Sequence, residues 1–307
     1  MSQNLHLIGF GSQGSAWASN LRTSGWNVNV YLGRAEGASY ERARAAGLPA
    51  SPTTELIKAL SEDTSDVALV AAMTPDHLIA PIYGDFLAAS ERPLTLVLAH
   101  GYTIYAGELV NLSRGHEAAL LAPKAIGPKL AAAHAQAYPK PHRLVAAFHA
   151  SFARAPRVAE LAAALGFSSE NLVPATFEQE AIGDLISEQT LLCGGIFSLL
   201  EWTMKEMTRA GVPTRLIHEE CITELELVAG MLRERGIVTT FNAISQAAQC
   251  GTISMYEVLV KAGLPTLVHE QAQDVISKRF VEYMRRPEWI TKAAALKERL
   301  ARLEKKS

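Results

Sequence analysis

A glycine-rich turn near the N-terminus constrains the fold of this chain more than any other segment. An apolar run at residues 5–8 leads into it, a helical pattern over residues 13–24 follows, and the turn itself reads Gly9-Phe10-Gly11-Ser12-Gln13-Gly14. Glycines at this spacing, GxGxxG, permit a tight turn and a close approach of the backbone to a ligand, and the start of the helix offers free N–H groups to a pyrophosphate. The GxGxxG pattern alone is weak evidence for dinucleotide binding, but its position between a predicted strand and a predicted helix makes it specific. We therefore expect the six residues of this turn to bind a dinucleotide.

The segments after this turn indicate the fold class. Short apolar runs alternate with helical patterns up to about residue 175, at residues 28–32, 67–72, 94–98 and 120–122, with weaker runs at 143–148 and 172–173. Buried strands that alternate with helices are typical of a parallel sheet. Beyond residue 175 only helical patterns remain. The sequence thus predicts an α/β, Rossmann-like N-terminal domain at residues 1–177 and an all-α C-terminal domain at residues 178–307.

Composition excludes several classes of protein. The chain has 29 Lys and Arg against 31 Asp and Glu, a net charge of −2, which is unlike a basic nucleic-acid binder. Its 49% hydrophobic and 20% charged residues are typical of a globular protein with a sizeable core. No apolar run approaches the roughly 20 residues that span a bilayer, and the N-terminus lacks a secretory pattern. We expect a cytoplasmic protein that binds neither nucleic acid nor membranes.

The end of the second predicted strand bears on which dinucleotide is bound. An NAD enzyme usually has an acidic residue there for the ribose 2′-hydroxyl, whereas this chain continues with Gly33 and Arg34. Arg34 is suited to pair with a 2′-phosphate and Ser39 to add a hydroxyl donor, although Glu36 favours NAD and Arg34 alone is compatible with a solvated loop charge. Thr74 follows the third buried strand, at the sheet edge where nucleotides bind. We expect NADP, with Arg34, Ser39 and Thr74 as further contacts.

Two acidic pairs in the helical half have the same spacing. Asp184 and Glu188 are four residues apart, and so are Glu220 and Glu224. Each pair would lie on one face of a helix, where like charges repel unless a cation offsets them. Apolar neighbours lead us to expect buried helices, in which such pairs are costly without a cation, and Mg²⁺ prefers oxygen ligands. The residues alone leave two interpretations open, a metal site and an ordinary solvated helix face.

Several motifs, taken in order, resemble ketol-acid reductoisomerase in the short form of that family. Residues 9–25 (GFGSQGSAWASNLRTSG) resemble its nucleotide loop and first helix, and residues 184–195 (DLISEQTLLCGG) and 220–225 (ECITEL) resemble its two metal motifs. Shorter segments resemble its His-Gly-Phe (residues 100–102, HGY), its Ala-Pro-Lys (residues 122–124, APK) and its substrate-binding Ser-Ile-Ser (residues 243–245, AIS). The resemblance implies a Rossmann-like domain followed by an intertwined helical dimerisation domain.

The resemblance also implies a reaction and a metal centre. The reaction is alkyl migration in an acetohydroxy acid followed by reduction with NADPH, a step of branched-chain amino-acid biosynthesis. Asp184 would bridge two Mg²⁺ ions and Glu188 would bind one of them. Glu220 and Glu224 would complete the site from the partner subunit of a homodimer, so that each active site is shared.

Three further residues receive roles from the resemblance. Ser245 would hydrogen-bond the substrate carboxylate, and Glu224 would touch the migrating substrate's oxygen as well as the metal. Lys124 would help to set the charge on a bridging oxygen through the metal shell. His100 would line the nicotinamide pocket.

Differences from the family pattern keep other functions open. Ala125 stands where the family has Gly after the lysine, Ala243 replaces the first Ser of Ser-Ile-Ser, and Gly37 stands where a phosphate-binding Ser is common. A metal-independent NADP-dependent hydroxyacid dehydrogenase or imine reductase would share the same architecture. A catalytically inactive NADP-binding homologue is the third hypothesis, although an idle buried cluster of like charges costs stability.

Overall fold

The computed structural model describes residues 3–34 and 36–304. The chain divides into two compact units, Met1–Ala181 and Ile182–Ser307, and the division falls within helix α8 (Phe177–Ser187). Each unit has its own architecture, and each is described by itself.

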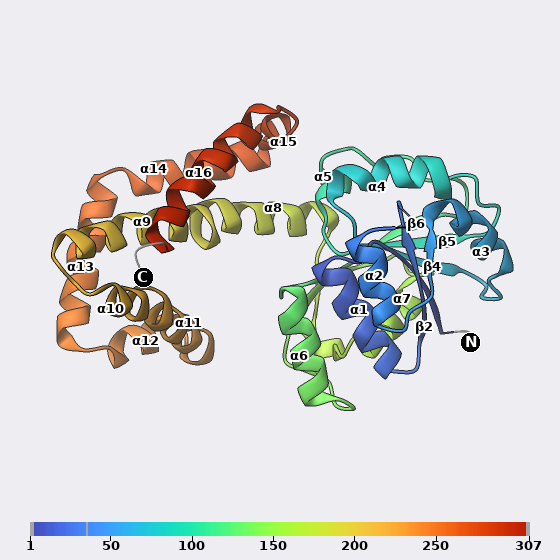
Figure 1. Ribbon diagram of the computed structural model, residues 1–307, viewed down its shortest axis with the longest axis horizontal. Helices are drawn as coiled ribbons and strands as arrows, with labels where there is room; N and C mark the ends of the chain where they lie inside the picture. The colour runs from blue at the N-terminus through green and yellow to red at the C-terminus, as the bar shows by residue number, and fades with distance from the viewer. Residues whose placement is uncertain (1–2, 35, 305–307) are drawn as a thin grey trace. The chain divides into compact units, whose positions relative to one another are not determined.

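The N-terminal unit is built on an eight-stranded sheet with the order β3-β2-β1-β4-β5-β6-β7-β8 (Figure 1). The strands are β1 (Asn4–Ile8), β2 (Asn27–Leu32), β3 (Ala50–Pro52), β4 (Ala68–Ala72), β5 (Leu94–Leu98), β6 (Glu117–Pro123), β7 (Ala146–His149) and β8 (Leu172–Pro174). All neighbours pair in parallel except β6 and β7, which are antiparallel. The expected Rossmann-like fold with a mainly parallel sheet is confirmed; β7 and β8, which are parallel to each other, run opposite to the other six strands.

Both edge strands of this sheet are short and end in proline. β3 and β8 have three residues each, and their last residues are Pro52 and Pro174. Proline has no N–H to donate to a neighbouring strand and is confined to such edges. The sequence did not predict β3, because three residues ending in proline carry no strand pattern.

Helices cover both faces of the sheet. They are α1 (Ser12–Thr23), α2 (Ala38–Ala45), α3 (Leu56–Glu62), α4 (Asp76–Ile82), α5 (Tyr102–Tyr105), α6 (Gly127–Ala137) and α7 (Ala155–Ala164). Alternate residues of a strand point to opposite faces. In β4, for example, Leu69 packs in a core with α1, α6 and α7, whereas Val70 packs in a second core with α3 and α4.

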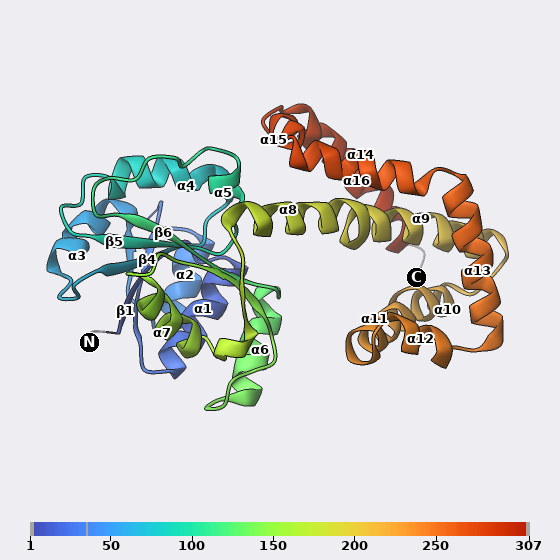
Figure 2. The ribbon, with the colours of Figure 1, turned by 180° about the vertical axis from the view of Figure 1, so that it is seen from behind.

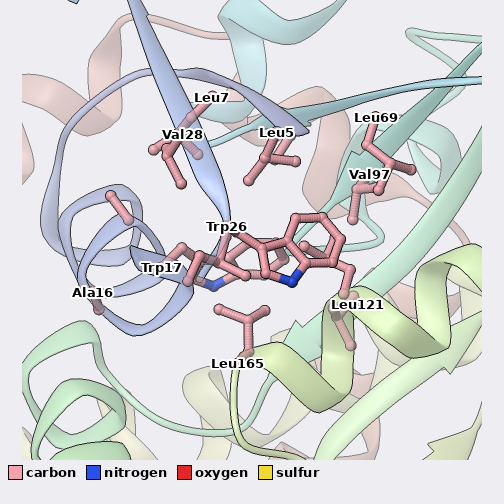
Figure 3. Packing of buried hydrophobic residues seen from close by; sticks show 14 of the residues in the cluster. Leu5, Leu7, Ala16, Trp17, Trp26, Val28, Leu69, Val97, Leu121 and Leu165 are labelled. Carbon is pink, nitrogen blue, oxygen red and sulfur yellow. The ribbon is translucent and has the colours of Figure 1, made fainter. Parts of the chain in front are cut away.

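Two tryptophans dominate the first core. Trp17 of α1 is fully buried and Trp26 is 4% exposed. Figure 3 shows both among side chains of the strands, such as Leu5 and Val97, and Leu165 after α7. Large aromatic side chains bury much apolar area, so this core fixes α1, and with it the glycine turn that precedes it, against the sheet.

The C-terminal unit consists of helices joined by short turns, with no strand among its described residues (Figure 2). Its α-helices are α9 (Gly194–Arg209), α10 (Thr214–His218), α11 (Glu224–Arg235), α12 (Ile237–Ala243), α13 (Gln246–Lys261), α14 (Leu264–Ile276), α15 (Arg279–Met284) and α16 (Glu288–Glu304). Two π-helical turns, η4 (Glu188–Leu192) and η5 (Glu219–Thr223), interrupt the α-helices. The expected all-α half is confirmed. No helix in the described part of the chain is long and apolar enough to cross a membrane.

Candidate active site

The glycine turn connects β1 to α1, and its glycines are required for different reasons. Gly9 has φ of +93°, and a Cβ atom there would lie 2.6 Å from the carbonyl oxygen of Met73. A Cβ atom at Gly14 would lie 2.5 Å from the carbonyl oxygen of Gly9. At Gly11 it would meet no protein atom within 4 Å. Packing of the chain therefore requires Gly9 and Gly14, whereas Gly11 keeps space open at the start of α1, where a pyrophosphate binds in such folds.

A pocket of about 680 Å³ opens beside this turn. Its lining includes six of the residues expected to bind the cofactor: Gly9, Phe10, Gly11, Arg34, Ser39 and Thr74. Glu36 and Gly37 also line it. The structure thus brings together the glycine turn and the segments after β2 and β4 at one sheet edge.

Two of the other three residues of the turn, Ser12 and Gln13, lie against the segment that follows β6. Gln13 Nε2 donates a hydrogen bond of 2.7 Å to the carbonyl oxygen of Ala125. Gly127 packs so closely on Ser12 that a Cβ atom at Gly127 would overlap the Ser12 carbonyl oxygen, and Gly14 is buried. Ser12 and Gln13 therefore tie the turn to the loop after Lys124.

A buried polar cluster supports the floor of the pocket. His6 Nδ1 lies 3.2 Å from the hydroxyl of Tyr31, and His6 Nε2 lies 2.9 Å from Asp63 Oδ2. Burial lowers the pKa of His6, against the opposing effect of Asp63. Burial raises the pKa of Tyr31, a pocket residue, to about 12, and Glu55, Asp63 and Glu62 add to this. Tyr31 therefore stays protonated and neutral in the pocket wall.

Lys124 and His100 converge on a carboxylate that was not predicted. Glu180, in α8, is 4% exposed. Its Oε1 accepts a hydrogen bond of 2.5 Å from Lys124 Nζ, and its Oε2 accepts one of 2.6 Å from the backbone N–H of Gly101. His100 Nε2 lies 3.8 Å from Oε2 of Glu180, and His100 Nδ1 lies 3.8 Å from Oδ1 of Asp76. Three segments thus meet at one buried negative charge.

The approach of α8 to this cluster depends on Gly101. A Cβ atom at that position would overlap the carbonyl oxygen of Phe177, the first residue of α8, and would lie 2.9 Å from Oε2 of Glu180. A signal for Glu180 was present in the sequence, because it stands four residues before Asp184 and so extends the spacing of Asp184 and Glu188 by one turn.

The four carboxylates expected to bind metal all lie next to π-helical turns. Asp184 is in the last turn of α8 and Glu188 is the first residue of η4. Glu220 is in η5, and Glu224 is the first residue of α11. Single π turns inside helices occur frequently at functional sites. The expectation of two pairs within regular α-helices differs from the structure, in which Glu188 and Glu220 belong to π turns.

Within a single chain these helices are not buried as expected. Glu188, Glu220 and Glu224 are exposed and Asp184 is half-buried. Leu191 and Leu192, apolar neighbours of the first pair, are 61% and 52% exposed. Apolar composition predicts that a helix face is covered, but it does not say that the same chain covers it.

The second pair lies at a groove of the helical unit. Glu220 and Glu224 line it together with apolar side chains: Ile196, Leu199, Leu200, Leu225 and Val228, with Thr203 and Cys221. Burial raises the pKa of the Cys221 thiol, and the charge of Glu220 adds to this. Glu220 and Glu224 therefore border an apolar surface.

Ser245 is the N-cap of α13. Its Oγ accepts a hydrogen bond of 3.2 Å from the backbone N–H of Ala248, and the residue is exposed. A hydroxyl that accepts in this way retains its own proton for donation. Ser245 is thus oriented to donate to an acceptor such as a carboxylate. Ala243, the last residue of α12, is exposed as well.

Comparisons with known families and structures cover almost the whole chain. Residues 1–170 match the family model described as acetohydroxy acid isomeroreductase, NADPH-binding domain, and residues 177–307 match that of the ketol-acid reductoisomerase C-terminal domain. Similar solved structures include an NADH-preferring ketol-acid reductoisomerase from an uncultured archean, with a TM-score of 0.80 and 23% identity over 98% of this chain and 92% of that chain.

Two further structures share the fold more distantly. One is a putative oxidoreductase from Jannaschia sp. CCS1, with a TM-score of 0.62 and 15% identity over 90% of this chain and 98% of that chain. The other is a semialdehyde dehydrogenase NAD-binding protein from Cupriavidus necator in complex with calcium and NAD. Its TM-score is 0.62, with 18% identity over 90% of this chain and 99% of that chain. Two family models in the expected order, together spanning most of the sequence, place the chain in the ketol-acid reductoisomerase family, whose members are nicotinamide-dependent oxidoreductases acting on a small-molecule substrate.

Proposed function

We propose that this enzyme is a Mg²⁺- and NADPH-dependent ketol-acid reductoisomerase that shares each active site between two subunits. The observation that carries the proposal is the cluster of Lys124, His100 and Glu180. It lies at the carboxyl ends of β5 and β6, in the same sheet edge as the nucleotide pocket, and Glu180 is one helical turn before Asp184. Reduction and metal chemistry thus have neighbouring residues to support them.

The donor set suits a hard divalent cation. All four expected ligands are carboxylates, and no Lys or Arg among the described residues forms an ion pair with Glu220 or Glu224. Carboxylate oxygens are the ligands that Mg²⁺ prefers. Asp184, Glu188, Glu220 and Glu224 would hold the metal. When bound, Mg²⁺ polarises the substrate oxygens as a Lewis acid, and the dihydronicotinamide provides the hydride.

Residues of the chain would then orient the substrate and hold protons. The Ser245 hydroxyl donates to the substrate carboxylate, because its oxygen is already engaged by Ala248 N–H. Lys124, fixed by Glu180, presents a positive charge to oxygens that gain negative charge during alkyl migration. His100 lines the nicotinamide side of the cluster, and Glu224 contacts the oxygen of the migrating substrate.

The surface of the helical unit supports the proposal of a second subunit. The groove that contains Glu220 and Glu224 has neither Asp184 nor Glu188 among its lining residues. Ile237, Val238 and Tyr256 are each more than two-thirds exposed, and apolar surface of this extent is typical of an obligate interface. A homodimer would cover this surface and would supply the second pair of carboxylates to the first.

NADPH is the cofactor that the ribose end of the pocket favours. Arg34 and Ser39 line the pocket and are suited to a 2′-phosphate. Glu36 lines it too, and a carboxylate there would favour the 2′-hydroxyl of NADH. The second candidate is therefore an NADH-dependent enzyme with the same reaction. Arg34→Gln distinguishes the two, because it should raise KM for NADPH several-fold and leave KM for NADH unchanged.

The reaction itself is tested with 2-acetolactate. The wild-type enzyme should oxidise NADPH only when both 2-acetolactate and Mg²⁺ are present, and EDTA should abolish turnover. Asp184→Asn should remove activity while NADPH binding, followed by fluorescence, persists. If Asp184→Asn retained activity with EDTA present, the protein would be a metal-independent reductase. NADPH binding without turnover of any acetohydroxy acid would identify an inactive homologue.

A further inference from the structure

Arg42 joins two segments of the cofactor pocket that are far apart in sequence. Its Nη2 atom donates a hydrogen bond of 3.2 Å to the carbonyl oxygen of Phe10 and another of 2.9 Å to Oγ of Ser39. Phe10 belongs to the glycine turn and Ser39 to the first turn of α2, and both residues line the pocket. One guanidinium nitrogen therefore connects the pyrophosphate end of the site with its ribose end.

The hydrogen bond to Ser39 determines how that hydroxyl can act. A serine hydroxyl has one proton and two lone pairs, and a guanidinium can only donate. Because the Ser39 oxygen accepts from Arg42, the Ser39 proton is directed elsewhere and is available to an acceptor in the pocket. A phosphate oxygen or a ribose hydroxyl of a dinucleotide is such an acceptor.

The hydrogen bond to Phe10 has an electrostatic consequence. The carbonyl of Phe10 carries partial negative charge in the middle of the turn that, in the proposed function, faces the pyrophosphate of the dinucleotide. Arg42 engages this oxygen with a positively charged donor, which offsets its repulsion of the phosphates. The same bond holds the turn against α2, which is only eight residues long and has no side-chain N-cap.

We propose that Arg42 is a positioning residue for the dinucleotide, holding the glycine turn and the Ser39 hydroxyl in the arrangement that binds the cofactor. The proposal depends on the nucleotide pocket alone. It requires neither Mg²⁺ nor a preference between NADPH and NADH, because the Phe10 carbonyl contributes to the pyrophosphate site that both cofactors share.

Arg42→Gln tests the proposal, with Arg44→Gln as the matched control. Arg44 is exposed on the same helix, but its guanidinium lies 5.9 Å from the centre of the Tyr40 ring and makes no contact with the glycine turn. Dissociation constants for NADPH and NADH would be measured by fluorescence titration without metal or substrate. The turnover number at saturating cofactor and the melting temperature would be measured alongside.

Arg42→Gln should weaken both cofactors about tenfold, the scale of one hydrogen bond to a charged group. The turnover number at saturating cofactor should change less than about twofold, and Arg44→Gln should leave both dissociation constants within about twofold of wild type. Arg42→Lys should recover part of the affinity, since it restores the charge but not the planar geometry. Arg42→Gln should raise the dissociation constants of the cofactors by a smaller factor in the Ser39→Ala variant than in wild type, because part of its effect acts through the Ser39 hydroxyl.

Three results would overturn the proposal. A loss of affinity for NADPH alone, with NADH binding unchanged, would make Arg42 only a ligand of the 2′-phosphate. Equal cofactor dissociation constants for Arg42→Gln and Arg44→Gln would show that the two hydrogen bonds have no role in binding. A melting temperature lowered only in Arg42→Gln, with a matching fall in the turnover number, would reduce the residue to general folding. Because the titrations use the cofactor alone, they remain decisive even if 2-acetolactate is not turned over.

Discussion

Glu180 shows how much of the site depends on a single buried carboxylate. Its two oxygens accept from Lys124 and from the backbone of Gly101, and its side chain is almost inaccessible to solvent. A charge buried in this way is stable only while its partners remain, and it holds them in place in return. The ammonium group of Lys124, which is partly exposed, is thus fixed from its buried side. In the proposed reaction its exposed side would face the substrate.

Glu180→Gln should lower the turnover number by about 10- to 100-fold. The amide oxygen can still accept from Gly101, whereas the charge-assisted hydrogen bond to Lys124, a contribution of about 1.5–3 kcal/mol, is lost. Steady-state NADPH oxidation at saturating substrate would measure this. Glu178→Gln is the control, since Glu178 is exposed in the same helix. Equal activity of the two variants would contradict the role given to Glu180.

Single residues of the nucleotide turn were predictable, whereas the partners of Glu180 and Arg42 were not. Gly9, Gly11 and Gly14 act through backbone geometry, which a fixed spacing records directly. Glu180 and Arg42 act through partners that are distant in sequence, such as Lys124 and Phe10. A spacing rule cannot detect these pairs, because they exist only once the sheet has brought the loops together.

The π turns explain the two consecutive glycines of the first metal motif. In η4 the chain is wider than an α-helix, and its carbonyl groups crowd the residues that follow. A Cβ atom at Gly194 would overlap the carbonyl oxygen of Gln189, and one at Gly195 would overlap that of Thr190. The glycines therefore permit the turn that begins with Glu188.

Gly194→Ala should destabilise the enzyme by about 1–3 kcal/mol, as expected for an added methyl group without space. It should also raise the Mg²⁺ concentration required for half-maximal activity, because the turn that carries Glu188 must shift. Gly230→Ala is the control: Gly230 is in α11, and a methyl group added there would meet no atom within 4 Å, so alanine should be neutral or stabilise by about 0.5–1 kcal/mol. Chemical denaturation and Mg²⁺ titration would test both. Identical behaviour of the two variants would refute this account of the glycines.

Among the elements, long buried strands were predictable and local deviations were not. β4 and β5 each consist of five buried residues, and each corresponds to a short apolar run in the sequence. The direction of β7 depends on the connection through α6, which apolar periodicity does not encode. The π turns at Glu188 and Glu220 were likewise invisible, since a spacing of four residues fits either type of turn.

For the whole molecule, the exposed apolar surface of the helical unit and the separation of the carboxylates into two pairs support a shared site. Composition predicted apolar helices, but whether one chain or two would cover them depends on assembly, which a single sequence does not state. A dimer with two-fold symmetry would place the first pair of one subunit opposite the second pair of the other, twice.

Mixing two inactive variants tests this arrangement. Asp184→Asn and Glu220→Gln should each abolish activity as homodimers. When they are co-expressed, half of the dimers should be mixed, and each mixed dimer should have one intact site, so activity should return to about a quarter of wild type. Purification with two different tags would isolate the mixed dimers.

Asp184→Asn paired with Glu188→Gln is the control for this experiment. Both changes fall on the same contributed segment, so no mixed dimer has an intact site and activity should not return. No recovery in the first mixture would place all four carboxylates of a site in one subunit. Recovery in this control would instead show that Asp184 and Glu188 of one site come from different subunits.

The short outer strands of the sheet have a consequence for self-association. β3 and β8 offer a neighbouring chain only three residues each, and Pro52 and Pro174 close them. Pairing of edge strands between molecules, which is a route to misassembly at high protein concentration, is therefore unfavourable at both edges of the sheet. We therefore expect subunits to associate through the helical half. There, contacts between side chains can select a particular partner, whereas backbone hydrogen bonding along a strand edge would accept almost any strand.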